Sequence, residues 1–298
     1  MMNKGIAYAL VAYGTWGFLP IFWKALHNVP AVEILSHRMV WSLIFLVLVL
    51  SYKQHWQWLR AAVHHPATLA TFVGTALLLT INWLTYIWAV NAGFIVETSL
   101  GYFINPLVNV ALGFIFLGER LRRGQWLAIV IALLGVLYLT LSYGALPWIA
   151  LTLAFSFATY GLLRKTARLN ALEGLSFEMG VVTPIALAYL IYLQLTGTAA
   201  FGQSGSTTLL LILTGGITAV PLLAFSAAAR RVTLTTLGIL QYIAPTLQFL
   251  IGVFIYGEVF GTDQMIGFGL IWGALLLYAA ESVAHNGKQH RLARQQLP

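Results

Sequence analysis

Charge is scarce in this sequence. Lysine and arginine number 16 and aspartate and glutamate 8 in 298 residues, so charged residues form only 8% of the chain. A soluble domain carries about 25%, and a soluble surface needs that charge to stay dissolved. Hydrophobic residues make up 60% of the chain, with a mean hydropathy of +0.85, which excludes a disordered protein. We therefore expect an integral membrane protein with several spans.

Cysteine and the common catalytic motifs are also missing. The absence of cysteine excludes disulfides, thiolate metal sites and cysteine nucleophiles. The sequence contains no H-E-x-x-H, no G-x-x-x-x-G-K-[ST] and no nucleophile elbow. No loop between the apolar runs is long enough for an ATPase or catalytic domain. We expect no cofactor and no metal, and transport that uses a gradient.

Long apolar runs are abundant. A membrane helix needs about 20 mostly apolar residues, and the runs lack the period-two alternation of a membrane barrel. The first run is too long for a signal peptide and has no cleavage site, so we expect it to be retained. The sequence predicts ten spans, at residues 5–25, 31–51, 67–90, 98–117, 124–143, 147–163, 174–195, 207–228, 234–256 and 264–283.

The basic residues test this topology. Ten spans place both termini on one side, and 14 of the 16 lysines and arginines fall on that side. Positive-inside bias makes it cytoplasmic, so the net charge of +8 marks topology and does not indicate nucleic acid. The 14 residues are Lys4, Lys53, Arg60, Arg120, Arg122, Arg123, Arg164, Lys165, Arg168, Arg230, Arg231, Lys288, Arg291 and Arg294.

The chain also repeats itself at an offset near 140 residues. Five spans per repeat is an odd number, so the second half enters the bilayer inverted, as in secondary transporters whose substrate site lies near the midplane. We expect one repeat over residues 1–144 and an inverted one over 145–298. The matches pair Ile104-Asn105-Pro106 with Ile243-Ala244-Pro245, Gly118-Glu119 with Gly257-Glu258, and Glu33-x-Leu35-Ser36-x-x-Met39 with Glu173-x-Leu175-Ser176-x-x-Met179.

Pro106 and Pro245 occupy equivalent positions in the fourth and ninth spans. Proline removes a backbone hydrogen bond and kinks a helix, and a matched pair of interrupted helices indicates a transporter cavity. We interpret both prolines as gating or hinge residues, although membrane helices tolerate proline generally.

Polar and aromatic residues gather in the same spans. Such side chains avoid lipid and face either a partner helix or a wet cavity, and single aromatics often only pack or mark the interface. Two symmetric polar faces beside two prolines favour a cavity. The candidate substrate-binding residues are Trp16, Arg38, Asn82, Tyr86, Tyr102, Asn105, Tyr160, Glu178, Gln241 and Tyr242.

Two charges lie inside the predicted spans. Arg38 in the second span and Glu178 in the seventh are equivalent in the repeat. A charge at such depth costs about 2.5–3.5 kcal/mol and needs a partner, so one hypothesis pairs Arg38 with Glu178, either as part of the site or as a structural salt bridge. His37 and Glu178 are also candidate proton-relay residues.

Small residues suggest where helices approach closely. Ala128-x-x-x-Ala132 and Gly269-x-x-x-Gly273 lie in the fifth and tenth spans and permit close contact. They either support each half internally, which we expect, or form a dimer seam. A monomer and a homodimer both remain open.

Six segments of the chain carry a family resemblance: Pro30-Ala-Val-Glu-Ile-Leu-Ser-His-Arg38, Ile87-Trp-Ala-Val-Asn91, Ser99-Leu-Gly-Tyr-Phe-Ile-Asn-Pro-Leu-Val-Asn109, Phe116-Leu-Gly-Glu-Arg120, Leu237-Gly-x-x-Gln-Tyr-Ile-x-Pro-Thr246 and Tyr256-Gly-Glu258. Together they resemble the RarD subfamily of EamA-type drug/metabolite transporters. The resemblance implies ten helices in two inverted five-helix repeats, a bacterial inner membrane, and a central cavity between spans one, three, four, six, eight and nine. The subfamily carries a chloramphenicol-sensitivity label, and its relatives export amino acids or other metabolites.

The leading hypothesis is a secondary transporter that exports small organic metabolites, either amino acids or amphipathic drugs such as chloramphenicol, by alternating access. A facilitator or channel-like pore is the alternative. A membrane-embedded lipid enzyme is a weaker one, because the seven histidines are scattered. The expected partners are a small-molecule substrate and the lipid bilayer, with no nucleic acid.

Overall fold

The computed structural model describes residues 4–91, 94–143, 148–256 and 261–295, and this part of the chain is helical without strands. Gly257 and Glu258, used in the repeat comparison, lie outside the described residues. So do the side chains of Lys288, Arg291 and Arg294. The described helices are α1 (Lys4–Lys24), α2 (Ala31–Tyr52), α3 (Gln57–Val63), α4 (Pro66–Asn91), α5 (Ile95–Leu117), α6 (Arg123–Tyr143), α7 (Trp148–Thr166), α8 (Ala171–Leu195), α9 (Gly205–Ala229), α10 (Leu234–Gln241), α11 (Ile243–Phe254) and α12 (Thr262–Gln295).

Each predicted span is helical, but fewer helices meet the requirements for crossing a membrane. Among the described residues, seven are long and apolar enough: α1, α2, α4, α5, α6, α8 and α9. The sixth span, α7, ends in Arg164 and Lys165, which lower its hydropathy. The ninth span is divided into α10 and α11, and the apolar part of the tenth covers only Met265–Glu281. The count of ten is therefore not confirmed by length and composition.

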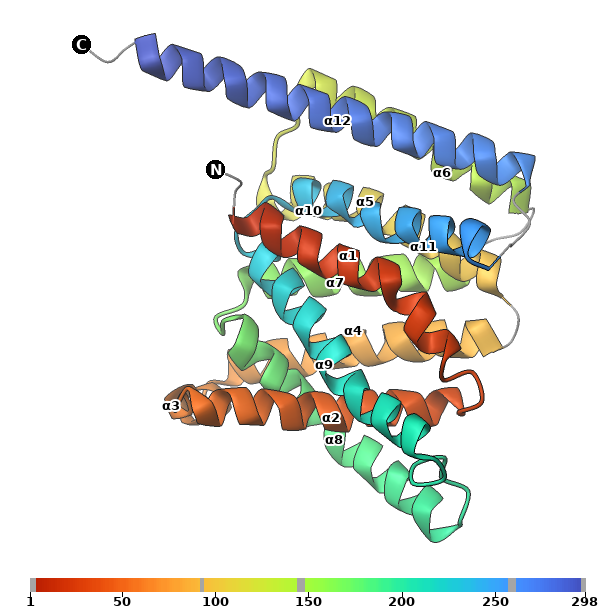
Figure 1. Cartoon of the computed structure of the whole chain (residues 1–298). Coiled ribbons are helices and arrows are strands. Elements are labelled where there is room, and N and C mark those ends of the chain that lie inside the picture. The colour runs from red at the N-terminus through yellow and green to blue at the C-terminus, as the bar shows by residue number, and fades with distance from the viewer. Residues whose placement is uncertain (1–3, 92–93, 144–147, 257–260, 296–298) are drawn as a thin grey trace.

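Most helices run side by side between the two ends of a bundle, α8 and α9 are oblique to them, and the start of α1 and the end of α12 lie at the same end (Figure 1). α12 packs along α6 at one edge of this bundle, and α2 packs against α8 and α9 towards the other. Between them, α5 packs against α7 and α10, while α1 packs against α9 and α11. The middle of the bundle is thus built from helices of both halves of the chain.

The two repeat-related prolines have different effects on their helices. α5 continues through Pro106, whereas the ninth span breaks at Tyr242, three residues before Pro245. Pro245 then lies in the first turn of α11, where a missing backbone N–H leaves no intrahelical bond unmade. The expectation of a matched pair of interrupted helices is therefore correct for the ninth span and wrong for the fourth.

The small-residue faces also differ from expectation. Ala128 and Ala132 pack with Ile271 and Ala274, so this contact joins α6 to α12 across the two halves. Our expectation that these faces support each half internally is wrong. The backbones of α6 and α12 approach closely at Gly135, because a Cβ there would lie 3.0 Å from the Gly267 carbonyl oxygen. Gly269 and Gly273 have open space beside them.

The N-terminus of α10 is capped by a carboxylate that follows the C-terminal end of α5. Glu119 accepts hydrogen bonds from the backbone nitrogens of Leu234 and Thr235, at 2.7 and 3.0 Å, and from Thr235 Oγ1 at 2.9 Å. An anion at a helix N-terminus satisfies free N–H groups and the helix dipole. Glu119 thereby ties the two halves together at the end that carries the termini.

We expect Glu119→Ala to lower the free energy of unfolding by about 1–2 kcal/mol, because the N-terminal nitrogens of α10 lose their acceptor. Glu119→Gln, which keeps one acceptor oxygen, should lose less. Denaturant titration in mixed micelles measures both variants. Equal stability of Glu119→Ala and the parent chain would contradict this role.

Candidate functional site

A cavity of about 100 Å³ lies between the two halves of the chain. This is several times the roughly 10–15 Å³ that one water molecule needs, so the space admits a small solute or a group of waters. The wall is formed by residues of α1, α2, α4, α5, α7, α9, α10 and α11: Tyr13, Trp16, Leu19, Pro20, Trp23, Arg38, Asn82, Trp83, Tyr86, Gly101, Tyr102, Asn105, Leu153, Phe157, Thr218, Leu222, Gln241, Ala244, Pro245 and Gln248.

Most residues singled out from the sequence are in this wall. The structure brings together eight of them: Trp16, Arg38, Asn82, Tyr86, Tyr102, Asn105, Gln241 and the hinge candidate Pro245. They come from six helices spread over the chain from α1 to α11. The convergence supports a common site.

Arg38 enters the cavity from α2. Its Nε donates a hydrogen bond to Thr218 Oγ1 of α9 at 3.0 Å. Its guanidinium carbon lies 4.9 Å from the centroid of the Trp23 ring and 4.6 Å from that of Trp83. Cation–π contact with two indoles offsets part of the cost of a charge at this depth.

An amide network forms another part of the wall. Asn82 donates to Leu153 O at 3.0 Å and to Ser156 Oγ at 2.9 Å, and Asn105 donates to Ala154 O at 2.6 Å. These bonds join α4 and α5 to α7. Both interpretations of these asparagines are therefore correct, because each side chain bonds to another helix and also lines the cavity.

The network continues to α10 through a residue outside the wall. Asn109 donates to Asn105 Oδ1 at 3.0 Å and to Gln241 Oε1 at 3.2 Å. Both acceptors belong to residues that line the cavity. Asn109 thus links the polar faces of α5 and α10, which the sequence placed in equivalent positions of the two repeats.

Aromatic rings close the cavity on a third side. Trp16 lies 5.6 Å from Phe157 and 5.7 Å from Tyr13, measured between ring centroids. Phe225 stands behind them, 5.8 Å from Trp16 and 5.0 Å from Phe157. Because these rings fix one another, the wall presents a rigid apolar surface to a bound molecule.

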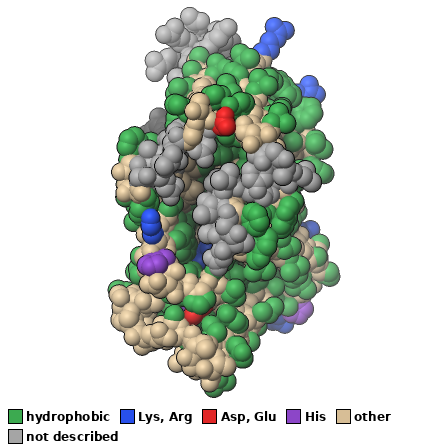
Figure 2. Space-filling model, turned by 90° about the vertical axis from the view of Figure 1, so that its right-hand side faces the viewer, with side chains coloured by type: hydrophobic (Ala, Val, Ile, Leu, Met, Phe, Trp, Pro, Cys, Tyr) green, Lys and Arg blue, Asp and Glu red, His purple; other side chains and the backbone are tan. Residues whose placement is uncertain are grey.

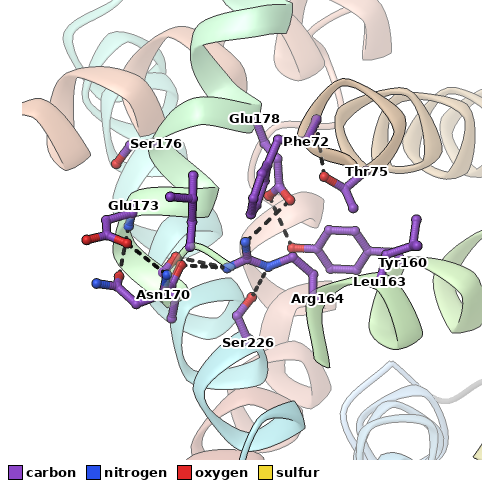
Figure 3. Close-up of polar contacts among 12 residues, drawn as sticks. Phe72, Thr75, Tyr160, Leu163, Arg164, Asn170, Glu173, Ser176, Glu178 and Ser226 are labelled. Carbon is purple, nitrogen blue, oxygen red and sulfur yellow. Dashed lines mark hydrogen bonds and ion pairs between the residues drawn. The ribbon is translucent and has the colours of Figure 1, made fainter. Parts of the chain in front are cut away.

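Two of the predicted site residues belong to a separate buried cluster (Figure 3). Tyr160 and Glu178 are fully buried and absent from the cavity wall. Tyr160 donates to Glu178 Oε2 at 3.3 Å, and Glu178 Oε1 lies 3.7 Å from Arg164 Nη1. The hypothesis that Arg38 pairs with Glu178 is wrong: Glu178 pairs with Arg164, while Arg38 points into the cavity.

The other candidates that lie outside the cavity wall pack against neighbouring residues. Tyr242 is fully buried and donates to Phe103 O at 3.1 Å, next to the break between α10 and α11. His37 is buried outside the cavity wall, where it stacks on Phe201 with ring centroids 5.0 Å apart. Pro106 lies behind the wall, against Gly238.

Three residues that matter to the site were missing from the sequence-based candidates. Trp23 and Trp83 hold Arg38, and Thr218 accepts its hydrogen bond. Of the three, Trp83 could have been found from the sequence, because it directly follows the candidate Asn82. Trp23 lies near a helix end, where tryptophan normally marks the interface.

The cavity lies towards the end of the bundle opposite the termini. Arg38 is in the first half of α2, and Asn82 and Tyr86 are in the second half of α4. Those halves point to the right in Figure 1, and Figure 2 shows that this face of the molecule is hollowed near its middle. Arg164, Glu178 and Tyr160 fill the space at the other end.

Comparison with known sequences matches the chain to one family. The "EamA-like transporter family" matches residues 3–141. Protein RarD of Escherichia coli K12 is 47% identical over 282 residues, covering 94% of this chain and 95% of that protein. The uncharacterized transporter YojE of Bacillus subtilis is 46% identical, with 94% and 95% covered.

More distant relatives agree. A Pseudomonas aeruginosa protein named chloramphenicol-sensitive protein RarD is 35% identical, covering 97% of this chain and 98% of that protein. A crystal structure of a protein with 17% identity superposes with a TM-score of 0.72 over 93% of this chain and 98% of that one, which shows a shared fold. The chain is a multi-pass bacterial membrane transporter, and it belongs to the RarD subfamily of the EamA-like transporter family.

Proposed function

We propose that this protein is a secondary transporter that exports small organic metabolites across the bacterial inner membrane by alternating access. The observation that carries the proposal is a cavity formed at the junction of the two halves, with four helices of each half in its wall. In this proposal the cavity faces the outside, and both termini are cytoplasmic because the end that carries them also carries most of the basic residues.

The helix contacts support two inverted repeats, over residues 1–144 and 145–298. Under the repeat, α1 corresponds to α7, α4 to α9, and α5 to α10 with α11. The contact of α5 with α7 then has its equivalent in the contact of α1 with α10 and α11, and that of α1 with α9 in that of α4 with α7. Two halves with equivalent contacts can exchange conformations at little difference in energy.

The closed end favours a carrier over a pore. Arg164 and Glu178 block the bundle there, and His55 Nε2 joins Glu173 Oε1 at 2.7 Å across the halves. Glu33, which corresponds to Glu173, accepts hydrogen bonds from the backbone nitrogens of Ala200 and Phe201 at the other end. In this proposal the equivalent contacts of α2 and α8 with the opposite half form two gates.

Counterflow in proteoliposomes tests the carrier proposal. We expect vesicles loaded with unlabelled substrate to accumulate labelled substrate transiently, with saturation, for at least one compound in a panel of amino acids, aromatic carboxylates and chloramphenicol. Protein-free vesicles are the control. Linear, unsaturable uptake would indicate a pore, and absence of exchange for every compound would overturn the proposal.

A reversible lock tests alternating access. Because the chain has no native cysteine, His55→Cys and Glu173→Cys introduce two unique thiols at the closed end. We expect a short bis-methanethiosulfonate bridge between them to abolish counterflow and dithiothreitol to restore it, while each single variant stays active under the same treatment. Full exchange by the bridged protein would show that this end does not need to open.

A further inference from the structure

We propose that the cavity selects molecules in which one carboxylate is attached to an aromatic or apolar body, with Arg38 binding the carboxylate. The inference rests on the proposed function, because it names the substrate class of the same site. It differs from the hypotheses of neutral drugs and free amino acids. The observation behind it is the distribution of charge and hydrogen-bond donors over the cavity wall.

Arg38 is the one charged residue among those that line the cavity in the described part of the chain. The ion pairs found there join His37 to Glu33, His55 to Glu173, Arg122 to Glu281 and Arg164 to Glu178. Arg38 therefore has no carboxylate partner within the described residues. A membrane protein that keeps an uncompensated cation in its interior does so for function.

The guanidinium is held so that its far edge stays available. The guanidinium lies over the rings of Trp23 and Trp83, and its Nε donates to Thr218 Oγ1. Within the described residues, the hydrogen bond to Thr218 is the one that Arg38 makes, which leaves both terminal nitrogens free. Two parallel N–H groups match the two oxygens of a carboxylate, and this planar fork is what distinguishes arginine from lysine.

The neutral polar groups of the wall also leave donors free. Gln241 uses its oxygen to accept from Asn109, and its amide nitrogen makes no hydrogen bond within the described residues. Asn82 and Asn105 use their nitrogens on α7. The free donors of Arg38 and Gln241 suit an anion, and the wall, as far as the described residues form it, contains no acidic residue to bind an ammonium group.

The rest of the wall suits a flat apolar body. Trp16 and Phe157 face the cavity with ring centroids 5.6 Å apart, and Leu153, Leu222 and Ala244 add aliphatic surface. Aromatic ligands gain from edge and face contacts with such rings. A carboxylate at one end and a ring at the other thus match the two regions of the wall.

A series with one skeleton and four charge states tests the inference. The probes are 3-phenylpropionate, 3-phenylpropanamide, 3-phenylpropylamine and phenylalanine, and binding to the purified full chain is measured by calorimetry in detergent at pH 7. We expect the propionate to bind about 10- to 100-fold more tightly than the amide. The amine should bind most weakly, and phenylalanine less tightly than the propionate because its ammonium group finds no counter-charge.

Variants at Arg38 identify the group responsible. Arg38→Gln should lose about 10- to 100-fold in propionate affinity while amide affinity stays unchanged, so that the preference disappears. Arg38→Lys should retain part of it. The matched control is Arg60→Gln, which removes the same charge from exposed α3 and should leave the series unchanged. If Arg38→Gln fails to fold, the affinities of the four probes for Arg38→Lys and for the parent chain still test the inference.

Binding of the amide or the amine as tightly as the propionate would overturn the inference, and so would failure of all four probes to bind at millimolar concentration. Retention of the propionate preference by Arg38→Gln would overturn the role of Arg38. None of these results contradicts the carrier proposal, since saturable counterflow of another compound would still support it. Absence of counterflow together with intact selective binding would contradict the carrier proposal and leave the binding inference supported.

Discussion

Replacing Glu178 by alanine is expected to lower the free energy of unfolding by about 3–5 kcal/mol, because Arg164 then stays buried without its counter-charge. Arg164 is 1% exposed and Glu178 is fully buried. Arg164 Nε donates to Ser226 Oγ at 3.1 Å, and Nη2 donates to the carbonyl oxygens of Asn170 and Ala171 at 3.3 and 3.0 Å. These bonds fix the guanidinium, so it cannot move out to water (Figure 3).

The double variant separates pairing from packing. Arg164→Met with Glu178→Met removes both charges and keeps most of the volume, so we expect it to recover at least half of the stability that Glu178→Ala loses. Glu173→Ala is the control in the same helix, because it removes the capping box with Asn170 and the partly exposed contact with His55, and its loss should be about 1–2 kcal/mol. Denaturant titration in mixed micelles gives all three values. A loss below about 1 kcal/mol for Glu178→Ala would contradict the ion pair.

A methyl group at Gly215 is expected to destabilise the fold by about 1–3 kcal/mol, through overpacking between α2 and α9. A Cβ there would lie 2.7 Å from Trp41 Cβ and closer still to the Trp41 carbonyl group. Backbone atoms cannot move aside as a flexible side chain can, so the two helices would have to separate. The bond from Ser42 Oγ to Gly215 O, now 3.2 Å, would lengthen with them.

The neighbouring glycine is the control. A Cβ added at Gly216 would have no heavy atom within 4 Å, so Gly216→Ala should be neutral or stabilise the helix by up to about 1 kcal/mol. Thermal unfolding followed by tryptophan fluorescence compares the two variants directly. Similar melting temperatures for Gly215→Ala and Gly216→Ala would rule out close packing at Gly215.

Hydropathy predicts the helices well because a bilayer imposes one length on every span. It fails where the local chemistry changes. The ninth span reads as one apolar run, but the helix breaks at Tyr242. The proline pattern pointed to this region without giving the position, since Pro106 in the same pattern leaves α5 intact.

The site was predicted by residue type rather than by contact. Arg38, Asn82 and Tyr102 could be found because polar groups in an apolar span need a reason to be there. Tyr160 and Tyr242 look the same in the sequence but pack inside the protein, since a tyrosine suits a buried cluster and a cavity equally well.

The proposed inverted repeat explains the error about Arg38 and Glu178. Equivalent positions in inverted repeats are related by an axis in the membrane plane, which carries a residue near one end of the bundle to the other end. Arg38 accordingly lies in the cavity and Glu178 at the closed end. Under the proposed repeat, sequence equivalence therefore predicts equivalent positions at opposite ends of the bundle and does not predict contact.

Arg38 is the one charged residue that the described residues contribute to the cavity wall, and this has a consequence for the energy of transport. In the proposed export, a carboxylate bound to Arg38, which lines the cavity, would form a neutral pair, and each anion released outside would carry one negative charge across the membrane. At an inside-negative voltage of about 100 mV this releases about 2.3 kcal/mol per charge, which sustains a concentration ratio of about 50-fold. Voltage alone would then drive export, without a proton or sodium ion moving in the opposite direction.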